Sequence, residues 1–394
     1  MSKNHFDYII CGGGASGLLL AYRLCKDPYF KDQSILLIEK DPKNINDRTW
    51  CFWESGEGDL EEMVHKNWNR AYFNADGFDL DFSMEPFQYK MIRSLDFYRS
   101  MKNKLSEFDQ LTRIREKVIG IDEDHVTTEV QTFHGDKIFS SIYDPKSLTQ
   151  QKKYPVLLQH FVGQVVQTKK PCFEPNKIDF MNFNVPQKGN TRFIYVLPMN
   201  ANKALIEYTL FSKNVLERKE YLDAIGAFLK QLPTGGYEVI EEEEGKIPMT
   251  CYRFDSENSA KILHIGTAGG WTKPSTGYTF QRINEKSKEL IDFLKKGQPL
   301  SRFSRRNRFW YYDLLFIDVL ARNNENGAKL FKRMFEKNSP EVIFNFLDEK
   351  SSFLQEFQIM RSFNVWQFVI ALWKRIFQEM RCINQYLRSL KRFF

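Results

Sequence analysis

The chain has 394 residues, 42% apolar and 27% charged, a composition typical of a globular protein and unlike that of a disordered one. Its formal net charge is +7, and most of this surplus lies in residues 361–394, where seven Lys and Arg accompany a single Glu. A near-neutral body with a basic end does not predict nucleic-acid binding. The six cysteines and six histidines have neither disulfide nor metal-ligand spacing, so we expect no metal site and a reducing compartment.

The first predicted element is a strand, glycine turn and helix at residues 7–21. Gly12, Gly14 and Gly17 fit the G-x-G-x-x-G frame of dinucleotide-binding folds. In that frame the first glycine permits a tight turn, the second lets the backbone approach a pyrophosphate, and the third lets the helix pack on the strand. The helix N-terminus offers N–H groups to the same phosphates. The pattern predicts a bound dinucleotide, and a structural βαβ unit without a ligand is the alternative.

A second predicted strand, residues 34–39, supports a bound dinucleotide. It ends on Glu39, 22 positions after Gly17, close to the spacing of about 20 residues that is typical of a ribose-binding carboxylate. Because the motif begins at residue 7, little chain precedes it that could act as a secretory signal, so we expect a cytoplasmic protein. No run of about 18 apolar residues predicts a membrane-spanning helix.

A polar loop at residues 41–49 leads into an aromatic run that contains Trp50 and Trp53. The two tryptophans could belong to the core or could line a pocket beside the dinucleotide. Arg48 could pair with a phosphate of the dinucleotide or with a surface acid. These alternatives stay open from the sequence.

Residues 157–212 contain strand-like runs at 157–168, 179–185, 192–198 and 203–211, which predict an antiparallel sheet. Glu207 interrupts a run apolar enough to be a buried strand. It is therefore either a site residue or part of the solvent face of an edge strand. A helix is predicted at 218–231, and the four consecutive acids at 241–244 predict a solvated face.

Residues 262–280 again read as strand, glycine turn and helix, and from residue 301 the pattern is helical to the end. A second such turn after an inserted sheet is what a two-piece flavin-binding domain requires. The early βαβ unit would hold the adenine side of the cofactor, and the late turn would close over the isoalloxazine. The chain is also rich in phenylalanine, with 35 residues, which predicts either a phenylalanine-rich core or a long apolar ligand cavity.

Three stretches, residues 46–53, 193–212 and 265–280, together resemble flavin-dependent lycopene cyclases of bacterial type. The resemblance implies an α/β Rossmann-like FAD-binding fold of the p-hydroxybenzoate hydroxylase type, with an inserted antiparallel sheet. On this basis we expect an FAD-binding part in two segments, a sheet that roofs the substrate, and a helical C-terminal region. Their expected bounds are 1–155 and 251–300 for the FAD-binding part, 156–250 for the sheet, and 301–394 for the helical region.

The resemblance also implies a reaction, an isomerisation (intramolecular lyase reaction) that closes the acyclic ψ ends of lycopene or related carotenoids into β rings, giving γ-carotene and β-carotene. Reduced FAD, with NAD(P)H as reductant, would be required and not consumed. Cyclisation needs a protonated carboxyl in an apolar pocket, which desolvation favours. Glu207 matches the first of two acids that relatives carry before Thr209, and Tyr208 stands where they have the second.

The late glycine turn departs from related flavoproteins at Thr267, where many have an Asp that holds the ribityl chain. We therefore expect backbone N–H groups near Gly269, Gly270 and Gly277 to contact the flavin instead. Near the C-terminus, apolar residues recur at three- and four-residue steps over 365–383 with bases between them. This predicts an amphipathic helix at a membrane interface, with a core-packing helix as the alternative. A lipid-soluble substrate favours peripheral membrane contact.

Two rival functions fit the same residues. One is another flavoenzyme of this fold, such as a monooxygenase, a halogenase or a prenyl-chain reductase. The other is a flavoprotein that binds an isoprenoid without converting it. Glu207 distinguishes the rivals, since a binding protein has no need of an acid there.

Overall fold

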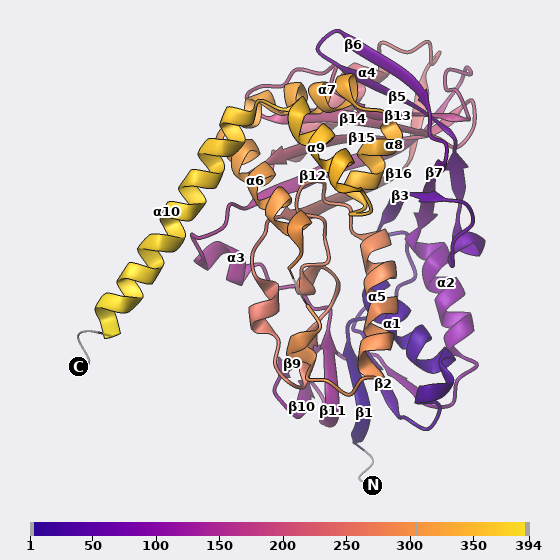
Figure 1. The fold of residues 1–394 in the computed structure, drawn as a ribbon. Helices are drawn as coiled ribbons and strands as arrows, with labels where there is room; N and C mark the ends of the chain where they lie inside the picture. Colours follow the sequence, from indigo (N-terminus) through magenta and orange to yellow (C-terminus); the bar gives the residue numbers. More distant parts are fainter. Residues whose placement is uncertain (1–3, 305, 391–394) are drawn as a thin grey trace.

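A computed structural model describes residues 4–304 and 306–390, with side chains through residue 378 and at 380. The chain forms three sheets, with helices packed around them and a long C-terminal helix that leaves the body (Figure 1). The mixed α/β architecture agrees with the predicted fold class.

The first sheet contains the glycine motif and is mainly parallel. Its central strands are apolar and buried on both faces, as expected where helices cover a parallel sheet. Its strands in spatial order are β8 (Leu111–Ile114), β2 (Ile35–Ile38), β1 (His5–Cys11), β11 (Thr132–Ser140), β10 (His125–Thr128) and β9 (Val118–Ile121), with β17 (Ile262–His264) also paired to β11. The helices that pack against it include α1 (Ala15–Lys26), α2 (Ser94–Leu105) and α5 (Phe280–Leu294).

The second sheet includes the strands expected at 156–250, but it is wider than expected. Its strands in spatial order are β16 (Tyr237–Met249), β12 (Leu157–Thr168), β15 (Lys203–Ser212), β14 (Thr191–Pro198), β13 (Lys177–Asn182), β5 (Arg70–Ala75) and β6 (Phe78–Ser83). The last two come from the segment assigned above to the FAD-binding part. They join because β5 pairs in parallel with β13, a nonlocal contact that strand pattern does not reveal.

A small third sheet contributes side chains to the cores of both other sheets. It consists of β3 (Thr49–Ser55), β7 (Phe87–Arg93) and β4 (Lys66–Trp68). Helix α3 (Lys146–Gln150) follows the first sheet, and α4 (Arg218–Leu229) packs on the outer face of the second. The C-terminal region consists of α6 (Arg308–Arg322), α7 (Gly327–Lys337), α8 (Pro340–Leu347), α9 (Phe353–Ser362) and α10 (Val365–Leu390).

The largest core lies between the inner face of the second sheet and the C-terminal helices. It is built largely from phenylalanine: Phe73 stacks on Phe335 with ring centroids 4.2 Å apart, and Phe183 stacks on Phe331. Large aromatic side chains bury much apolar area each, so they fix the helices to the sheet. The phenylalanine content thus serves a core, and it also lines an apolar cavity described below.

Candidate active site

Four of the predicted site residues, Gly14, Arg48, Glu207 and Gly277, line a cavity of about 430 Å³ between the first and second sheets. One side is the N-terminus of α1, from Gly14 to Ser16. The opposite side is the inner face of the second sheet, which contributes Glu207, and a third side is the segment from Thr276 to Phe280. Four segments far apart in the sequence therefore meet here, counting the Lys43–Cys51 loop.

The early glycines have the geometry that the dinucleotide frame requires. Gly12 has φ = +103°, a conformation open mainly to glycine. A Cβ on Gly17 would lie 1.9 Å from the carbonyl oxygen of Gly12, so only glycine lets α1 pack this closely. A Cβ on Gly14 would meet nothing within 4 Å, which leaves open space at the helix N-terminus where a phosphate would approach.

Glu39 lies beside the glycine loop, and Arg48 lines the cavity. The Glu39 carboxylate accepts hydrogen bonds from the backbone N–H groups of Gly13 at 2.5 Å and Asp41 at 2.8 Å. Arg48 is exposed, lines the cavity, and donates from Nη1 to the carbonyl oxygen of Asp47 at 2.6 Å. This hydrogen bond holds the guanidinium where the cavity meets solvent, so the guanidinium can reach an anion bound in the cavity.

The late glycines separate into two groups. Gly277 lines the cavity with φ = +74°, and a Cβ there would lie 2.0 Å from Gln159 Oε1. Gly269 and Gly270 instead line a neighbouring cavity of about 120 Å³. A Cβ on Gly269 would lie 2.1 Å from the carbonyl oxygen of His264, and a Cβ on Gly270 would lie 2.7 Å from the Phe254 ring. Close packing therefore explains glycine at both positions.

The cavity has features that suit a flavin dinucleotide. A helix N-terminus, which leaves backbone N–H groups without helical partners, faces open space at Gly14. Gln159 Oε1 is buried on the cavity wall and has no hydrogen-bond partner among the described residues. Thr267 also lines this cavity. The residues present therefore fit FAD.

Glu207 lies on β15 and lines the cavity from the inner face of the second sheet. Its pKa is raised to about 8, mainly by burial and in part by the charge of Glu243, while a 2.5 Å hydrogen bond donated by the Thr209 hydroxyl acts against the rise. The carboxyl is therefore protonated at neutral pH. This is the state that a general acid requires.

Glu243, in the run assigned above to a solvated face, is a second acid beside the site that sequence analysis missed. It is paired through β12 with Glu207, because Gly163 is the register partner of both glutamates. A Cβ on Gly163 would lie 3.2 Å from Glu243 Cγ, so the Glu243 side chain leans over the glycine. Its Oε2 accepts a 2.6 Å hydrogen bond from the Thr49 hydroxyl. The solvated-face interpretation holds only for the alternate residues Glu242 and Glu244, which are exposed.

Tyr208, which occupies the position of the second acid in relatives, faces away from the cavity. It is buried against α4, and its hydroxyl accepts a 3.3 Å hydrogen bond from Arg192. Neighbouring residues of a strand point to opposite faces of the sheet, so a side chain at 208 cannot share the face of Glu207. A second carboxylate near Glu207 is supplied by Glu243 instead.

Three tyrosines close the apolar end of the cavity. The Tyr278 hydroxyl lies 3.2 Å from that of Tyr89 and 3.5 Å from that of Tyr195. Burial raises the pKa of all three phenols well above the ordinary value, so they stay neutral. Trp53 packs edge-on against Tyr278, with ring centroids 4.6 Å apart. Neutral aromatic groups thus surround the space in front of Glu207.

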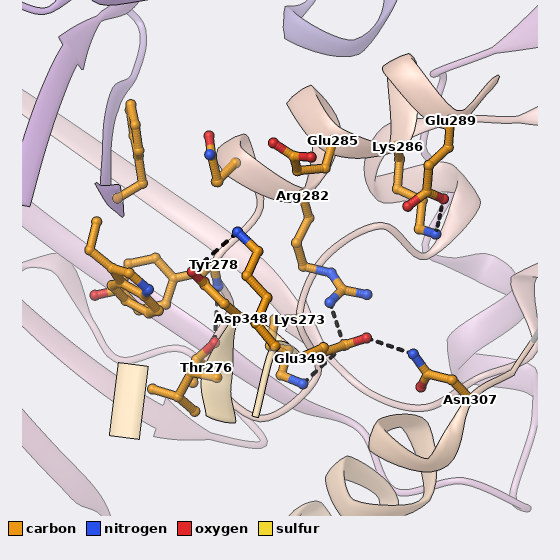
Figure 2. Close-up of a pocket in the computed structure, with 15 residues that line it drawn as sticks. Lys273, Thr276, Tyr278, Arg282, Glu285, Lys286, Glu289, Asn307, Asp348 and Glu349 are labelled. Atoms are coloured by element: carbon orange, nitrogen blue, oxygen red, sulfur yellow. Dashed lines mark hydrogen bonds and ion pairs between the residues drawn. The ribbon is translucent and has the colours of Figure 1, made fainter. Parts of the chain in front are cut away.

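A charged clamp on the far side of the late glycine segment holds it to the C-terminal helices. Lys273 is 3% exposed and pairs with Asp313 at 3.0 Å and Glu349 at 3.1 Å. Figure 2 shows Lys273, Arg282 and Asn307 pointing toward Glu349 in a second cavity of about 300 Å³. The Lys273 backbone also bonds Gly277 and Tyr278. The clamp therefore fixes the residues that line the Glu207 cavity.

A sequence profile described as "Lycopene cyclase protein" matches residues 7–374, nearly the whole chain. The chain belongs to the lycopene cyclase family. A lycopene beta-cyclase from Pseudescherichia vulneris is 25% identical over 362 residues, covering 85% of this chain and 88% of that one. A lycopene beta-cyclase from Pantoea ananas is 25% identical over 301 residues, which cover 70% of this chain and 71% of that one. Membership supports an enzyme that acts on carotenoids.

Solved structures place this member of the lycopene cyclase family in the p-hydroxybenzoate hydroxylase-type flavoprotein fold. A geranylgeranyl bacteriochlorophyll reductase-like protein from Thermoplasma acidophilum matches with a TM-score of 0.57 at 12% identity, covering 91% of this chain and 96% of that one. The flavin-dependent brominase Bmp2 matches with a TM-score of 0.53 at 13% identity, covering 98% and 100%. At these identities the likeness shows the fold alone, and it confirms the predicted fold class.

Proposed function

We propose that the protein is a lycopene β-cyclase that converts the ψ end groups of lycopene into β rings by acid-initiated cyclisation. The observation that supports this most is a protonated carboxyl, Glu207, enclosed among neutral aromatic groups in a member of the lycopene cyclase family. Such a carboxyl can protonate an isolated double bond. A water-filled site would instead quench the cation that follows.

In the proposed mechanism, the Glu207 carboxyl gives its proton to the terminal double bond of a ψ end group. A carbocation forms, and the neighbouring double bond attacks it to close the ring. A proton then leaves a ring carbon, and the Glu207 carboxylate produced in the first step can accept it. No atoms are gained or lost overall, so the reaction is an isomerisation. The aromatic faces of the tyrosine group and Trp50 stabilise the cation.

FAD would be held by the N-terminus of α1 around Gly12, Gly14 and Gly17, by Glu39 at the ribose, by Arg48 at a phosphate, and by the late segment at Gly277. Gly269 and Gly270 would act indirectly, by shaping the turn before that segment. When bound and reduced, with NAD(P)H as the source of electrons, the flavin supplies electron density near the cation and is not consumed.

We also propose that the protein is cytoplasmic and peripheral on the membrane, with contact through α9 and α10. Both helices present exposed apolar side chains, including Phe353, Leu354 and Trp366. The exposed bases Arg361 and Lys374 lie beside them, which suits anionic lipid. Of the amphipathic pattern predicted over 365–383, the side chains at 379 and 381–383 lie outside the described residues. No helix in the described part of the chain is long and apolar enough to cross a membrane.

Expression in a host that accumulates lycopene tests the function. We expect the wild-type protein to produce γ-carotene or β-carotene and Glu207→Gln to leave lycopene unconverted while retaining its FAD. Stoichiometric consumption of NAD(P)H with an oxidised or reduced product would instead show another flavoenzyme. Lycopene that stays bound and unchanged in the wild-type protein would show a binding protein.

A further inference from the structure

We infer that an apolar cavity beneath the C-terminal helices binds the polyene body of the substrate while its end group reaches Glu207 past Tyr278. The inference rests on the proposed function and adds to it a second binding site. That site is a cavity of about 370 Å³ lined by residues of α6, α7, α8, α9 and α10. Its walls are mainly aromatic and aliphatic, with contributions from Phe316, Phe346, Phe363, Phe368 and Val369.

A small cavity lies between the apolar cavity and the Glu207 cavity and shares lining residues with both. This small cavity, of about 10 Å³, shares Tyr195 and Tyr278 with the Glu207 cavity, and it shares Met334 and Leu347 with the apolar cavity. Thr276 lines all three. The three cavities are therefore neighbours, and the side chains that they share are the partitions between them. Met334 is unbranched and flexible, so it can move aside when a chain passes.

The outer end of the apolar cavity opens at the surface proposed to meet the membrane. Phe357, Met360, Val365 and Leu372 line the cavity and are also exposed. An apolar chain that leaves lipid at α9 and α10 would enter here without crossing water. The mouth and the proposed membrane surface thus coincide on the same two helices.

The chemistry of the Glu207 cavity explains why the polyene leaves by this route. Its other end is charged, with Lys43, Asp47 and Arg48 on the wall, which suits the phosphates of a dinucleotide. Burying charged groups against a polyene would cost free energy. The aromatic end of the cavity, beside Tyr278, imposes no such cost. Because a conjugated chain is stiff, the polyene also needs a straight apolar path.

Paired substitutions on α10 test the inference. Val369 lines the cavity, whereas the next residue, Ile370, is exposed and does not line it. We would compare Val369→Asp and Leu372→Asp with Ile370→Asp, using purified protein with reduced FAD and lycopene delivered in detergent micelles. Micellar delivery removes any need for membrane binding. All three variants carry the same added charge on one helix.

We expect Val369→Asp to lower the rate of cyclisation by about 100-fold, because an unpaired carboxylate would lie in the path of the polyene. Leu372→Asp, whose carboxylate would be partly hydrated at the mouth, should lower the rate by about 10-fold. Ile370→Asp should stay within a few-fold of the wild-type rate. FAD content and Tm should match across the set. If Val369→Asp folds poorly, Leu372→Asp still tests the site, because Leu372 is exposed and a charge there disturbs packing less. Equal rates in all variants would overturn the polyene site. A wild-type protein that does not cyclise lycopene would overturn the proposed function instead.

Discussion

At the residue scale, the protonation state of Glu207 sets a pH dependence. Burial raises its pKa to about 8, and the proton donor is the neutral carboxyl. The acid form therefore predominates below this pKa and is lost as the pH rises through about 8. We expect kcat/KM for lycopene cyclisation to fall on the alkaline side with this midpoint, measured in micelles with FAD kept reduced. A rate that falls instead with a midpoint near the ordinary value for Glu would contradict the assignment.

Glu243 should control that midpoint. Its carboxylate lies across Gly163 from Glu207 and raises the pKa of Glu207 by like-charge repulsion. In Glu243→Gln the repulsion is removed, so we expect the alkaline midpoint to move to lower pH by about one unit. Glu244→Gln is the matched control, because Glu244 is exposed and pairs with Arg218 at 2.7 Å. A loss of rate in Glu243→Gln without a shifted midpoint would show a structural role alone.

The two glutamates also show what sequence can predict about the site. Glu207 could be recognised because it interrupts an apolar run. Glu243 could not, because four consecutive acids look uniformly solvated. Strand alternation would have placed Glu241 and Glu243 on one face and Glu242 and Glu244 on the other. Which face meets the site depends on the pairing of β16 with β12, which is a nonlocal contact.

At the element scale, the clamp around Lys273 joins the late glycine segment to the C-terminal helices. Burial acts to raise the pKa of the Glu349 carboxyl, but the charges of Lys273 and Arg282 outweigh it and hold that pKa well below the ordinary range. Lys273→Met would leave Asp313 and Glu349 buried with fewer partners, so we expect a loss of about 3–5 kcal/mol in the free energy of unfolding, measured by urea denaturation.

The control for the clamp is Lys286→Met on α5. Lys286 also lines the second cavity, but it pairs with Glu289 where both side chains are substantially exposed. Exposed ion pairs contribute less than about 1 kcal/mol, so this variant should unfold near the wild-type midpoint. Equal losses in both variants would mean that the buried position of Lys273 has no special effect.

The elements themselves were largely predictable where the signal is local. The strand expected at 157–168 is β12, and the helix expected at 218–231 is α4, which ends at Leu229. The glycine turn at residues 12–17 was recognisable because its backbone geometry demands glycine. Gly269 and Gly270 carry the same residue type for a different reason, close packing against His264 and Phe254, which only the fold reveals.

At the scale of the whole molecule, the first sheet and the C-terminal helices lie at different ends of the body, and α10 extends away from it (Figure 1). Arg375 anchors α10 through Asp318 on α6 at 2.6 Å. The apolar side chains of α9 and α10 are exposed, with Phe353 at 72%, Leu354 at 82% and Trp366 at 74%. Several large apolar side chains exposed on two consecutive helices favour a surface that binds a partner or a membrane.

If that surface meets lipid, Leu354→Glu combined with Trp366→Glu should weaken binding to anionic vesicles by at least about tenfold, because two apolar contacts are lost and two like charges are added. Vesicle flotation measures the bound fraction. Ile119→Glu is the control, because Ile119 is an exposed apolar residue on β9, far from the helices (Figure 1). Added salt should weaken wild-type binding only in part, since screening removes the attraction of the bases and leaves the apolar contacts. Binding that salt abolishes, or that Ile119→Glu weakens equally, would contradict insertion of this surface into lipid.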